Sequence, residues 1–499
     1  MSNSRGRLRP PGSPGIDPLT VQGEVSAAAP ARHTLARNYQ ATVAHGAGTK
    51  KSSADRRLYA VMIVMALLYY SYRWFLKYND ASTSPTYSST PVTFEVAKYV
   101  ILLAGFYIIV IAVLALRRTL KLDRTAALFF TGLLLLLIYL TLVTLMKVVF
   151  GDPFSRGSIG SLLGAPSGTS AGTLSLPAKA LIPLPFALLF PFVWTSWKES
   201  RTLARALLLV AVIQVALSAI EVTSYMLSGR LPALGYAGGL VRFGGAWDDP
   251  NGFSLFADAA ILGTLAAREA HLIGTRLAVI LYVVWTALLA ITVSFSGWLA
   301  LLVGIPTYLL VSGRRVLLAA VLVVAGLLSI ILFAVEPTNP LLASIWEGKQ
   351  ASAIGHWQLA VNGLHPTSLS LMDALFGSVS PTFNEVSYIA FFNYYGLVGI
   401  AWSAALVAMT LHRSIRFART LIGDRSVAFY RFGVSFAVAF LVGSLFVPYF
   451  FVFPINVVFW LVVAGLWTAP TWSRSFAALP VEVLERQSGK DSHLQTRSR

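Results

Sequence analysis

Long apolar segments separated by short polar ones are the most regular feature of the sequence. A helix rises about 1.5 Å per residue, so about 20 apolar residues cross the roughly 30 Å hydrocarbon core of a bilayer. Such segments lie near 58–76, 96–116, 126–150, 179–196, 202–228, 252–267, 275–293, 296–312, 315–335, 386–410, 428–447 and 450–469. They predict an all-α fold, a polytopic membrane helix bundle with about twelve transmembrane helices.

Basic residues fall in alternate loops between these segments. The loops after the second, fourth, sixth, eighth and tenth segments contain Arg117, Arg118, Lys121 and Arg124, then Lys198 and Arg201, then Arg268 and Arg276, then Arg314 and Arg315, then Arg413, Arg416, Arg419 and Arg425. Loops rich in Lys and Arg face the cytoplasm, so both termini are expected there. The long loop 336–384, between the ninth and tenth segments, is then extracytoplasmic, and loops of that length are usually functional.

Composition narrows the choice of function. The chain is 56% hydrophobic and 12% charged, so its net charge of +18 follows from topology-determining loops, and a nucleic-acid partner is not expected. There is no cysteine, which excludes thiolate catalysis and Cys-ligated metals. No nucleotide-binding or metalloprotease motif occurs, and neither a metal nor another cofactor is predicted. We expect a disordered basic cytoplasmic tail at 1–57, a membrane domain at 58–470 and a polar cytoplasmic tail at 471–499.

The densest polar cluster precedes the sixth apolar segment. It contains Arg242, two glycines, the adjacent Asp248 and Asp249, and Asn251 after a proline. An arginine fork suits phosphate oxygens, and glycine lets a ligand approach the backbone. The simpler alternative is a capped helix start, which accounts for the Asp, Pro and Gly but not for Arg242.

Three ionisable residues fall inside predicted spans. Glu221, Asp258 and Lys147 lie at similar depths near the outer surface, and Asn251 shares a helical face with Asp258. Charges within a membrane normally pair or line a wet cavity. They are therefore candidates for lining a polar cavity on the outer side, and the alternative is a structural ion-pair cluster.

The end of the long outer loop supplies a candidate general base. Glu385 and Tyr388 share one helix face, and a carboxylate at the membrane boundary can accept a proton. The alternative is that Asn384 caps the tenth helix and Glu385 complements its dipole. Weaker polar candidates lie within the same loop: Glu347, Lys349, His356, Trp357 and His365.

Four short motifs, taken in order, resemble a known family. They are Arg242-Phe243-Gly244-Gly245 with Asp249-Pro250-Asn251, then Val293-Ser294-Phe295-Ser296-Gly297-Trp298, then His365-Pro366 with Leu375-Phe376-Gly377, then Asn384-Glu385-Val386-Ser387-Tyr388 with Tyr395-Gly396-Leu397. Together with twelve spans and a long outer loop, they resemble the O-antigen ligase and polymerase superfamily over about residues 200–445. Members of this superfamily transfer glycans from undecaprenyl diphosphate on the outer face of the bacterial inner membrane.

The resemblance implies roles for particular residues. Arg242, with Arg156 and Arg230, would bind the diphosphate of an undecaprenyl-diphosphate-linked oligosaccharide, and Glu385, His356 or Asp248 would activate the acceptor hydroxyl. The chemistry would be inverting and independent of metal. A flippase and a chain-length regulator of the same pathway would be partners of this membrane-embedded enzyme.

Two departures from the ligase pattern favour a polymerase of exopolysaccharide or O-antigen. Many ligases have Ser-Arg-Gly where this chain has Ser296-Gly297-Trp298, and a histidine where it has Asn384-Glu385. The alternatives are a ligase that transfers glycan to lipid A core or protein, a polysaccharide transporter or flippase, and a non-catalytic scaffold. No internal repeat is apparent, which counts against a transporter built from duplicated halves.

Overall fold

The computed structural model describes a set of helical segments within the unit Arg56–Arg499. The described residues are 124–150, 180–193, 197–228, 236–237, 240–247, 249–335, 370–378, 386–420, 426–452 and 454–477, with scattered positions in 60–68 and 343–361. The helices are α5 (Arg124–Phe150), α8 (Pro183–Val193), α9 (Trp197–Ser228), α10 (Pro250–Glu269), α11 (Thr275–Ile291), α12 (Phe295–Val311), α13 (Arg315–Val335), α15 (Leu371–Phe376), α16 (Ser387–Thr420), α17 (Ser426–Gly443) and α18 (Ile455–Ala477). The all-α class is confirmed.

Several of these helices are apolar enough for a bilayer. Three are also long enough to cross it, at Arg124–Met146, Ala206–Leu227 and Ser387–Ala418. Shorter apolar helices lie at Thr275–Ile291, Phe295–Val311, Arg315–Val324, Val427–Gly443 and Ile455–Thr468. By length and composition, the three longer ones are candidate membrane-spanning helices. The total of twelve, the long outer loop and the orientation stay predictions, and the first two predicted spans fall largely outside the described residues.

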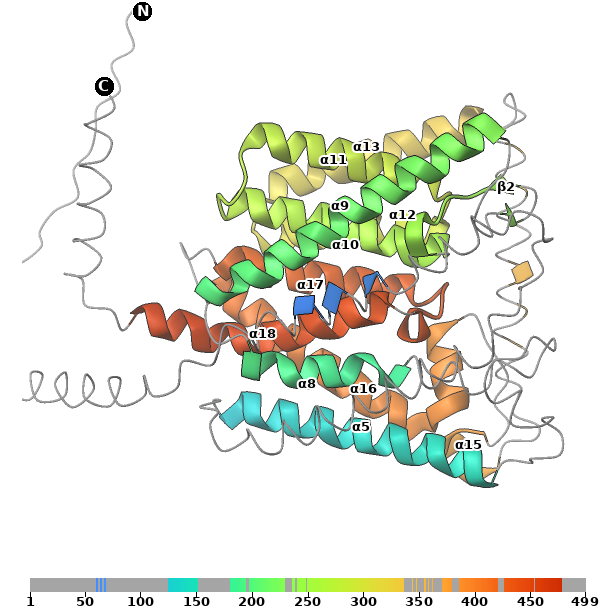
Figure 1. The fold of residues 1–499 in the computed structure, drawn as a ribbon, viewed down its shortest axis with the longest axis vertical. Helices are drawn as coiled ribbons and strands as arrows, with labels where there is room; N and C mark the ends of the chain where they lie inside the picture. Colours follow the sequence, from blue (N-terminus) through green and yellow to red (C-terminus); the bar gives the residue numbers. More distant parts are fainter. Residues whose placement is uncertain are drawn as a thin grey trace, which may run out of the picture. The chain divides into compact units, whose positions relative to one another are not determined.

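The helices α10, α12 and α17 pack against one another and form the centre of the described bundle (Figure 1). α11 lies against α10, α13 lies against α12, and α16 and α18 lie against α17. Small residues permit the close central contacts: a Cβ placed on Gly304 would lie 3.1 Å from Leu262 of α10 and 3.3 Å from Ala439 of α17. Such small-residue contacts are typical of membrane helices, where lipid gives no hydrophobic drive for helix association.

A pair of two-residue strands is the exception to the helical fold within the described part of the chain. β1 (Tyr236–Ala237) and β2 (Leu240–Val241) are antiparallel, with Tyr236 opposite Val241. A single 3₁₀ turn, η2 (Gly245–Trp247), follows shortly before α10. This short ladder fixes the chain immediately before Arg242.

Helix α16 is bent at Gly396, where φ is 63°. The bend brings Gly396 against α15, because a Cβ on Gly396 would lie 2.3 Å from the Leu375 carbonyl group. Gly377, with φ of 84°, makes the reciprocal contact with the backbone of Tyr394. Two motifs that are about 20 residues apart in the sequence thus pack backbone to backbone.

Several predicted boundaries were wrong. α9 begins at Trp197, so Lys198 and Arg201, predicted in the loop before it, belong to the helix. Arg268 and Arg276, also predicted in a loop, lie in α10 and α11. α16 continues past residue 410 to Thr420, so Arg413 and Arg416 belong to a helix and not to a loop. The helix continues because Arg413 lies over the Trp467 ring, 4.4 Å from its centroid, and donates to Thr125. α18 starts at Ile455 instead of 450, because Pro448 and Pro454 flank a separate 3₁₀ turn, η5 (Tyr449–Phe451).

Candidate functional site

Arg242 follows directly on β2 and is held from two sides. Its Nε donates to the Thr292 carbonyl oxygen at 3.0 Å, and its Nη2 donates to Asn251 Oδ1 at 2.7 Å. The backbone is fixed as well, since Phe243 N donates to the Ile291 carbonyl oxygen at 3.1 Å. The other guanidinium N–H groups donate to no acceptor among the described residues. The cation is therefore oriented but has donors left over.

Partial burial sets the electrostatics of Arg242. Its side chain is half-buried, and burial lowers the pKa of the guanidinium, whereas the nearby Asp249 carboxylate acts to raise it. An arginine remains protonated in proteins. A partly desolvated cation with unused donors favours the approach of an anion.

The start of α10 positions Asp249 and Asn251, the acidic and the amide neighbour of Arg242. Asp249 is the N-cap residue and accepts from Asn251 N at 2.9 Å, and Pro250 occupies the first turn. This cap turns the Asn251 side chain toward Arg242. The capped helix start and the phosphate-site hypothesis are thus compatible, because the cap itself positions a partner of the arginine.

A chain of hydroxyl groups continues from Asn251 into the bundle. Ser294 Oγ donates to Asn251 Oδ1 at 2.9 Å and lies 3.1 Å from Ser296 Oγ, which shares a 3.0 Å hydrogen bond with the Tyr449 hydroxyl. Tyr449 in turn donates to the Asn251 carbonyl oxygen at 3.1 Å. We call these residues the Arg242 network: Arg242, Asn251, Ser254, Ser294, Ser296 and Tyr449.

Ser254 and Tyr449 complete the network from opposite sides. Ser254 Oγ lies 2.7 Å from the Asn251 carbonyl oxygen and 3.0 Å from Ser294 Oγ. Both Ser254 and Tyr449 are fully buried. Burial raises the pKa of the Tyr449 phenol, so this group stays a neutral hydroxyl that can both donate and accept.

The turn between α11 and α12 has an unusual backbone. Val293 has φ of 47°, which β-branched residues rarely adopt. Thr292 supplies the carbonyl acceptor of Arg242, and the Ser294 side chain caps α12 by accepting from Gly297 N. The strained backbone at Val293 is held in place because Thr292 accepts a hydrogen bond from Arg242 and Ser294 donates one to Asn251.

Glu221 has a structural role in this region. Its Oε2 accepts from Gly245 N at 2.9 Å, and the residue is completely buried in α9. Gly245 has φ of 57°, and an added Cβ would lie 2.8 Å from Ser218 Oγ. The Glu221 carboxylate thus fixes the backbone of Gly245, the second of the two glycines that follow Arg242.

Asp258 lies two helical turns below Asn251 on the same helix. It is completely buried, and its carboxylate oxygens accept no hydrogen bond from the described residues. Gln214 of α9 is likewise buried, and its side-chain amide has no described partner. Asp258 was predicted to line a polar cavity on the outer side, and that cavity stays a prediction.

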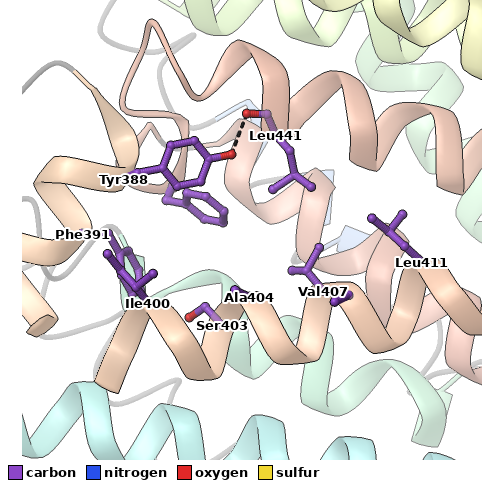
Figure 2. Close-up of a pocket in the computed structure, with 10 residues that line it drawn as sticks. Tyr388, Phe391, Ile400, Ser403, Ala404, Val407, Leu411 and Leu441 are labelled. Carbon is purple, nitrogen blue, oxygen red and sulfur yellow. Dashed lines mark hydrogen bonds between the residues drawn. The ribbon is translucent and has the colours of Figure 1, made fainter. Parts of the chain in front are cut away.

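Tyr388 lies apart from Arg242, in the wall of an apolar pocket between α16 and α17 (Figure 2). Its hydroxyl donates to the Leu441 carbonyl oxygen at 2.6 Å. The preceding residue, Ser387, donates to the Val447 carbonyl oxygen at 2.8 Å and accepts from Phe450 N at 3.4 Å. The start of α16 is thereby tied to the segment that contains Tyr449.

The structure brings together some of the predicted site residues. Arg242, Asp249 and Asn251 are in contact, and Glu221 supports the adjoining glycine. The positions of Asp248, Arg156, Arg230, His356 and Glu385, and the side chain of Lys147, lie outside the described residues. Among the residues that are described, no three His, Asp or Glu side chains are grouped so that they could hold a metal ion.

Tyr449 and Ser254 are the members of the network that sequence reasoning missed, and Tyr449 comes from the more distant segment. It stands in the run Val447-Pro448-Tyr449-Phe450-Phe451, which continues the apolar pattern of the helices on either side. The two flanking prolines were the available signal, because proline cannot continue a helix interior. They indicated an interruption in which a tyrosine could turn toward a polar partner.

Comparison with known proteins leaves the family of this chain open. A scan against protein-family models found no match, and a search of curated proteins found no similar sequence. Fold and site define the class: a helical protein with candidate membrane-spanning helices and an oriented arginine beside a buried hydroxyl network. Any narrower assignment rests on the residues themselves.

Proposed function

We propose that this protein is a membrane glycosyltransferase that polymerises lipid-linked oligosaccharide repeat units. The donor would be an undecaprenyl-diphosphate-linked oligosaccharide at the outer face of the bacterial inner membrane, and the product exopolysaccharide or O-antigen. The observation that carries the proposal is Arg242: its orientation is fixed by Asn251 and Thr292, while other N–H groups remain for an anionic ligand.

The reaction would be an inverting displacement. The acceptor hydroxyl oxygen forms a bond to the anomeric carbon of the donor sugar, while the bond from that carbon to the diphosphate oxygen breaks. The electron pair leaves with the diphosphate, and a cationic donor such as Arg242 stabilises that growing negative charge. Glu385, with His356 and Asp248 as alternatives, would accept the hydroxyl proton.

Support for a polymerase over a ligase comes from the packing at Gly297. A Cβ on this residue would lie 2.4 Å from Ser254 Oγ and 2.5 Å from Ser254 Cβ, both in α10. An arginine, which many ligases have at the corresponding motif position, does not fit between α10 and α12 as they pack here. The network instead places Ser296 and Tyr449 hydroxyls at this level.

A transporter or flippase receives less support from the described residues. Glu221, one of three residues that would form its polar path, is engaged by Gly245 N. Asp258 remains compatible with such a path, since its carboxylate is buried without a described partner. The two functions differ in which lipid-linked species accumulates when the protein is deleted.

The decisive experiment is complementation of a deletion strain with Arg242→Ala and Arg242→Lys. We expect both variants to insert in the membrane but to yield little or no polymer, because lysine cannot reproduce the two-sided fork contact. Arg276→Ala, at an exposed arginine of α11, is the matched control and should give normal polymer. Chain-length analysis of surface and lipid-linked glycan is the measurement.

Three results are distinguishable in that strain. Accumulation of lipid-linked single repeat units supports a polymerase. Polymer of normal length that is not joined to its final acceptor indicates a ligase, and repeat units confined to the cytoplasmic leaflet indicate a flippase. Normal polymer from a well-expressed Arg242→Ala variant would overturn the role of this arginine.

A further inference from the structure

An elongated apolar groove runs along one face of α16. Its floor is formed by Ile400, Ser403, Ala404, Val407, Ala408 and Leu411. These positions recur at helical spacings of three and four, so they form one stripe. From Ile400 to Leu411 the stripe extends over 11 helical rises, which corresponds to about 16 Å along the helix axis. Figure 2 shows Ile400, Ser403, Ala404, Val407 and Leu411 following one another along this helix.

Small side chains and aromatic rings give the groove its shape. Ala404 and Ala408 are exposed, so the groove is open along part of its length. Phe391 and Tyr388 precede the bend at Gly396 and close one end together with Phe450, whose ring centroid is 5.8 Å from that of Phe391. The cavity volume is about 190 Å³. Its length and apolar lining suit a flexible hydrocarbon chain better than a compact polar ligand.

The closed end of the groove adjoins the Arg242 network through two consecutive residues. Phe450 contributes its ring to the groove wall, and Tyr449 contributes its hydroxyl to the network. Successive Cα atoms are about 3.8 Å apart. The η5 turn therefore lies between the hydroxyl network that positions Arg242 and the apolar groove, and Ser387 joins the same turn to α16.

We propose that the groove along α16 binds the isoprenoid chain of the anionic lipid whose diphosphate lies at Arg242. This inference rests on the proposed function and adds to it a place for the lipid tail. An amphiphile with an anionic head and a long apolar chain matches the two sites in both charge and polarity. The orientation follows: the end of the chain nearest the head lies beside Phe450, and the remainder runs toward Leu411.

The test is binding of undecaprenyl phosphate to the purified full chain in nanodiscs of phosphatidylcholine. Ala404→Phe fills the middle of the groove, and because Ala404 is exposed this change is compatible with folding. We expect it to weaken binding about tenfold, since the chain loses apolar contact along the groove. Ala405→Phe, also exposed but outside the groove lining, is the matched control and should bind within about twofold of the parent.

A second arm separates the isoprenoid chain from ordinary lipid. Palmitoyl-oleoyl phosphatidylglycerol is added as competitor at the same concentration as undecaprenyl phosphate. Weak competition supports the proposal, whereas equal competition means a general acyl-chain site and overturns it. Unchanged binding by Ala404→Phe also overturns it, as does a dimer that dissociates on this substitution, because the groove would then be an interface between copies.

Failure of the groove assignment and failure of the proposed function give different results. If the groove is assigned wrongly, Arg242→Ala still abolishes polymer, while Ala404→Phe retains normal binding and normal polymer. If the function is assigned wrongly, Ala404→Phe still weakens binding of undecaprenyl phosphate, while Arg242→Ala leaves the polymer intact. The two variants therefore report on the two proposals separately.

Discussion

At the scale of single residues, the hydrogen bonds that Arg242 donates determine how many of its N–H groups remain for a ligand. Asn251 and Thr292 hold two nitrogens, so the guanidinium plane is fixed before any ligand arrives. Preorganised donors stabilise developing charge without having to reorient during the reaction. The buried hydroxyls behind Asn251 contribute by fixing that amide rather than by contacting the guanidinium.

Tyr449→Phe tests this supporting role. The substitution removes the hydroxyl that contacts Ser296 and the Asn251 carbonyl oxygen, so we expect a loss of about 0.5–1.5 kcal/mol in unfolding free energy. Polymer yield should fall less than for Arg242→Ala. The measurements are denaturant unfolding in detergent and glycan length. Tyr282→Phe, at a hydroxyl without a hydrogen bond in the described part, should change neither.

Gly245→Ala tests the backbone that follows Arg242. An alanine at φ of 57° is strained, and its Cβ would meet Ser218 and the Phe253 ring at 2.8 and 3.0 Å. We expect destabilisation of about 1–3 kcal/mol. Gly274→Ala is the comparison, since φ there is −74° and nothing lies within 4 Å of the added Cβ. Equal unfolding midpoints for the two variants would contradict the left-handed conformation of Gly245.

At the scale of elements, helices were predictable wherever polar residues flank an apolar segment on both sides. The segment 315–335 was predicted with the bounds that the structure gives to α13, and 275–293 differs from α11 by two residues. Hydropathy alone could not place the end of α16, because a helix continues into polar sequence when long side chains such as Arg413 find aromatic partners.

The candidate site was predictable only in part. Arg242, Asp249 and Asn251 lie close together in the sequence, so local turn and cap signals revealed them. Ser296 and Tyr449 join them from segments about 45 and 200 residues further along, and only helix packing brings those hydroxyls together. No local signal in a single sequence encodes such a contact.

Gly396→Ala tests the bend that joins α15 to α16. The added Cβ would lie 2.3 Å from the Leu375 carbonyl group at a positive φ, so we expect a loss of stability of at least about 1–3 kcal/mol. Gly326→Ala, inside α13 with nothing within 4 Å, should instead stabilise by about 0.5–1 kcal/mol through helix propensity. Thermal unfolding in detergent shows whether each substitution lowers or raises the stability of the protein.

At the scale of the whole molecule, the arrangement of basic loops predicts which ends of the helices face the cytoplasm. The absence of cysteine from the chain makes this orientation directly measurable, because a single introduced thiol is the one target of a maleimide reagent. Exposed positions at opposite helix ends are available for such probes.

Leu272→Cys and Leu371→Cys provide the test. Leu272 is 69% exposed in the turn between α10 and α11, and Leu371 is 74% exposed at the start of α15. We expect an impermeant maleimide added to intact cells with a permeabilised outer membrane to label Leu371→Cys and not Leu272→Cys. Labelling of both from one side would contradict the predicted orientation, and the cysteine-free parent sets the background.

Polar contacts join α10 and α12 at both ends, and α17 takes part in them at one end. At one end Ser254 and Ser296 belong to the same hydroxyl chain, and at the other Glu269 pairs with Arg431 and accepts from Tyr308 at 2.6 Å. Sliding α10 along α12 would break polar contacts at both ends at once, and sliding α17 along α10 would break the Glu269–Arg431 pair. We therefore expect any opening that admits a substrate to come from the surrounding helices.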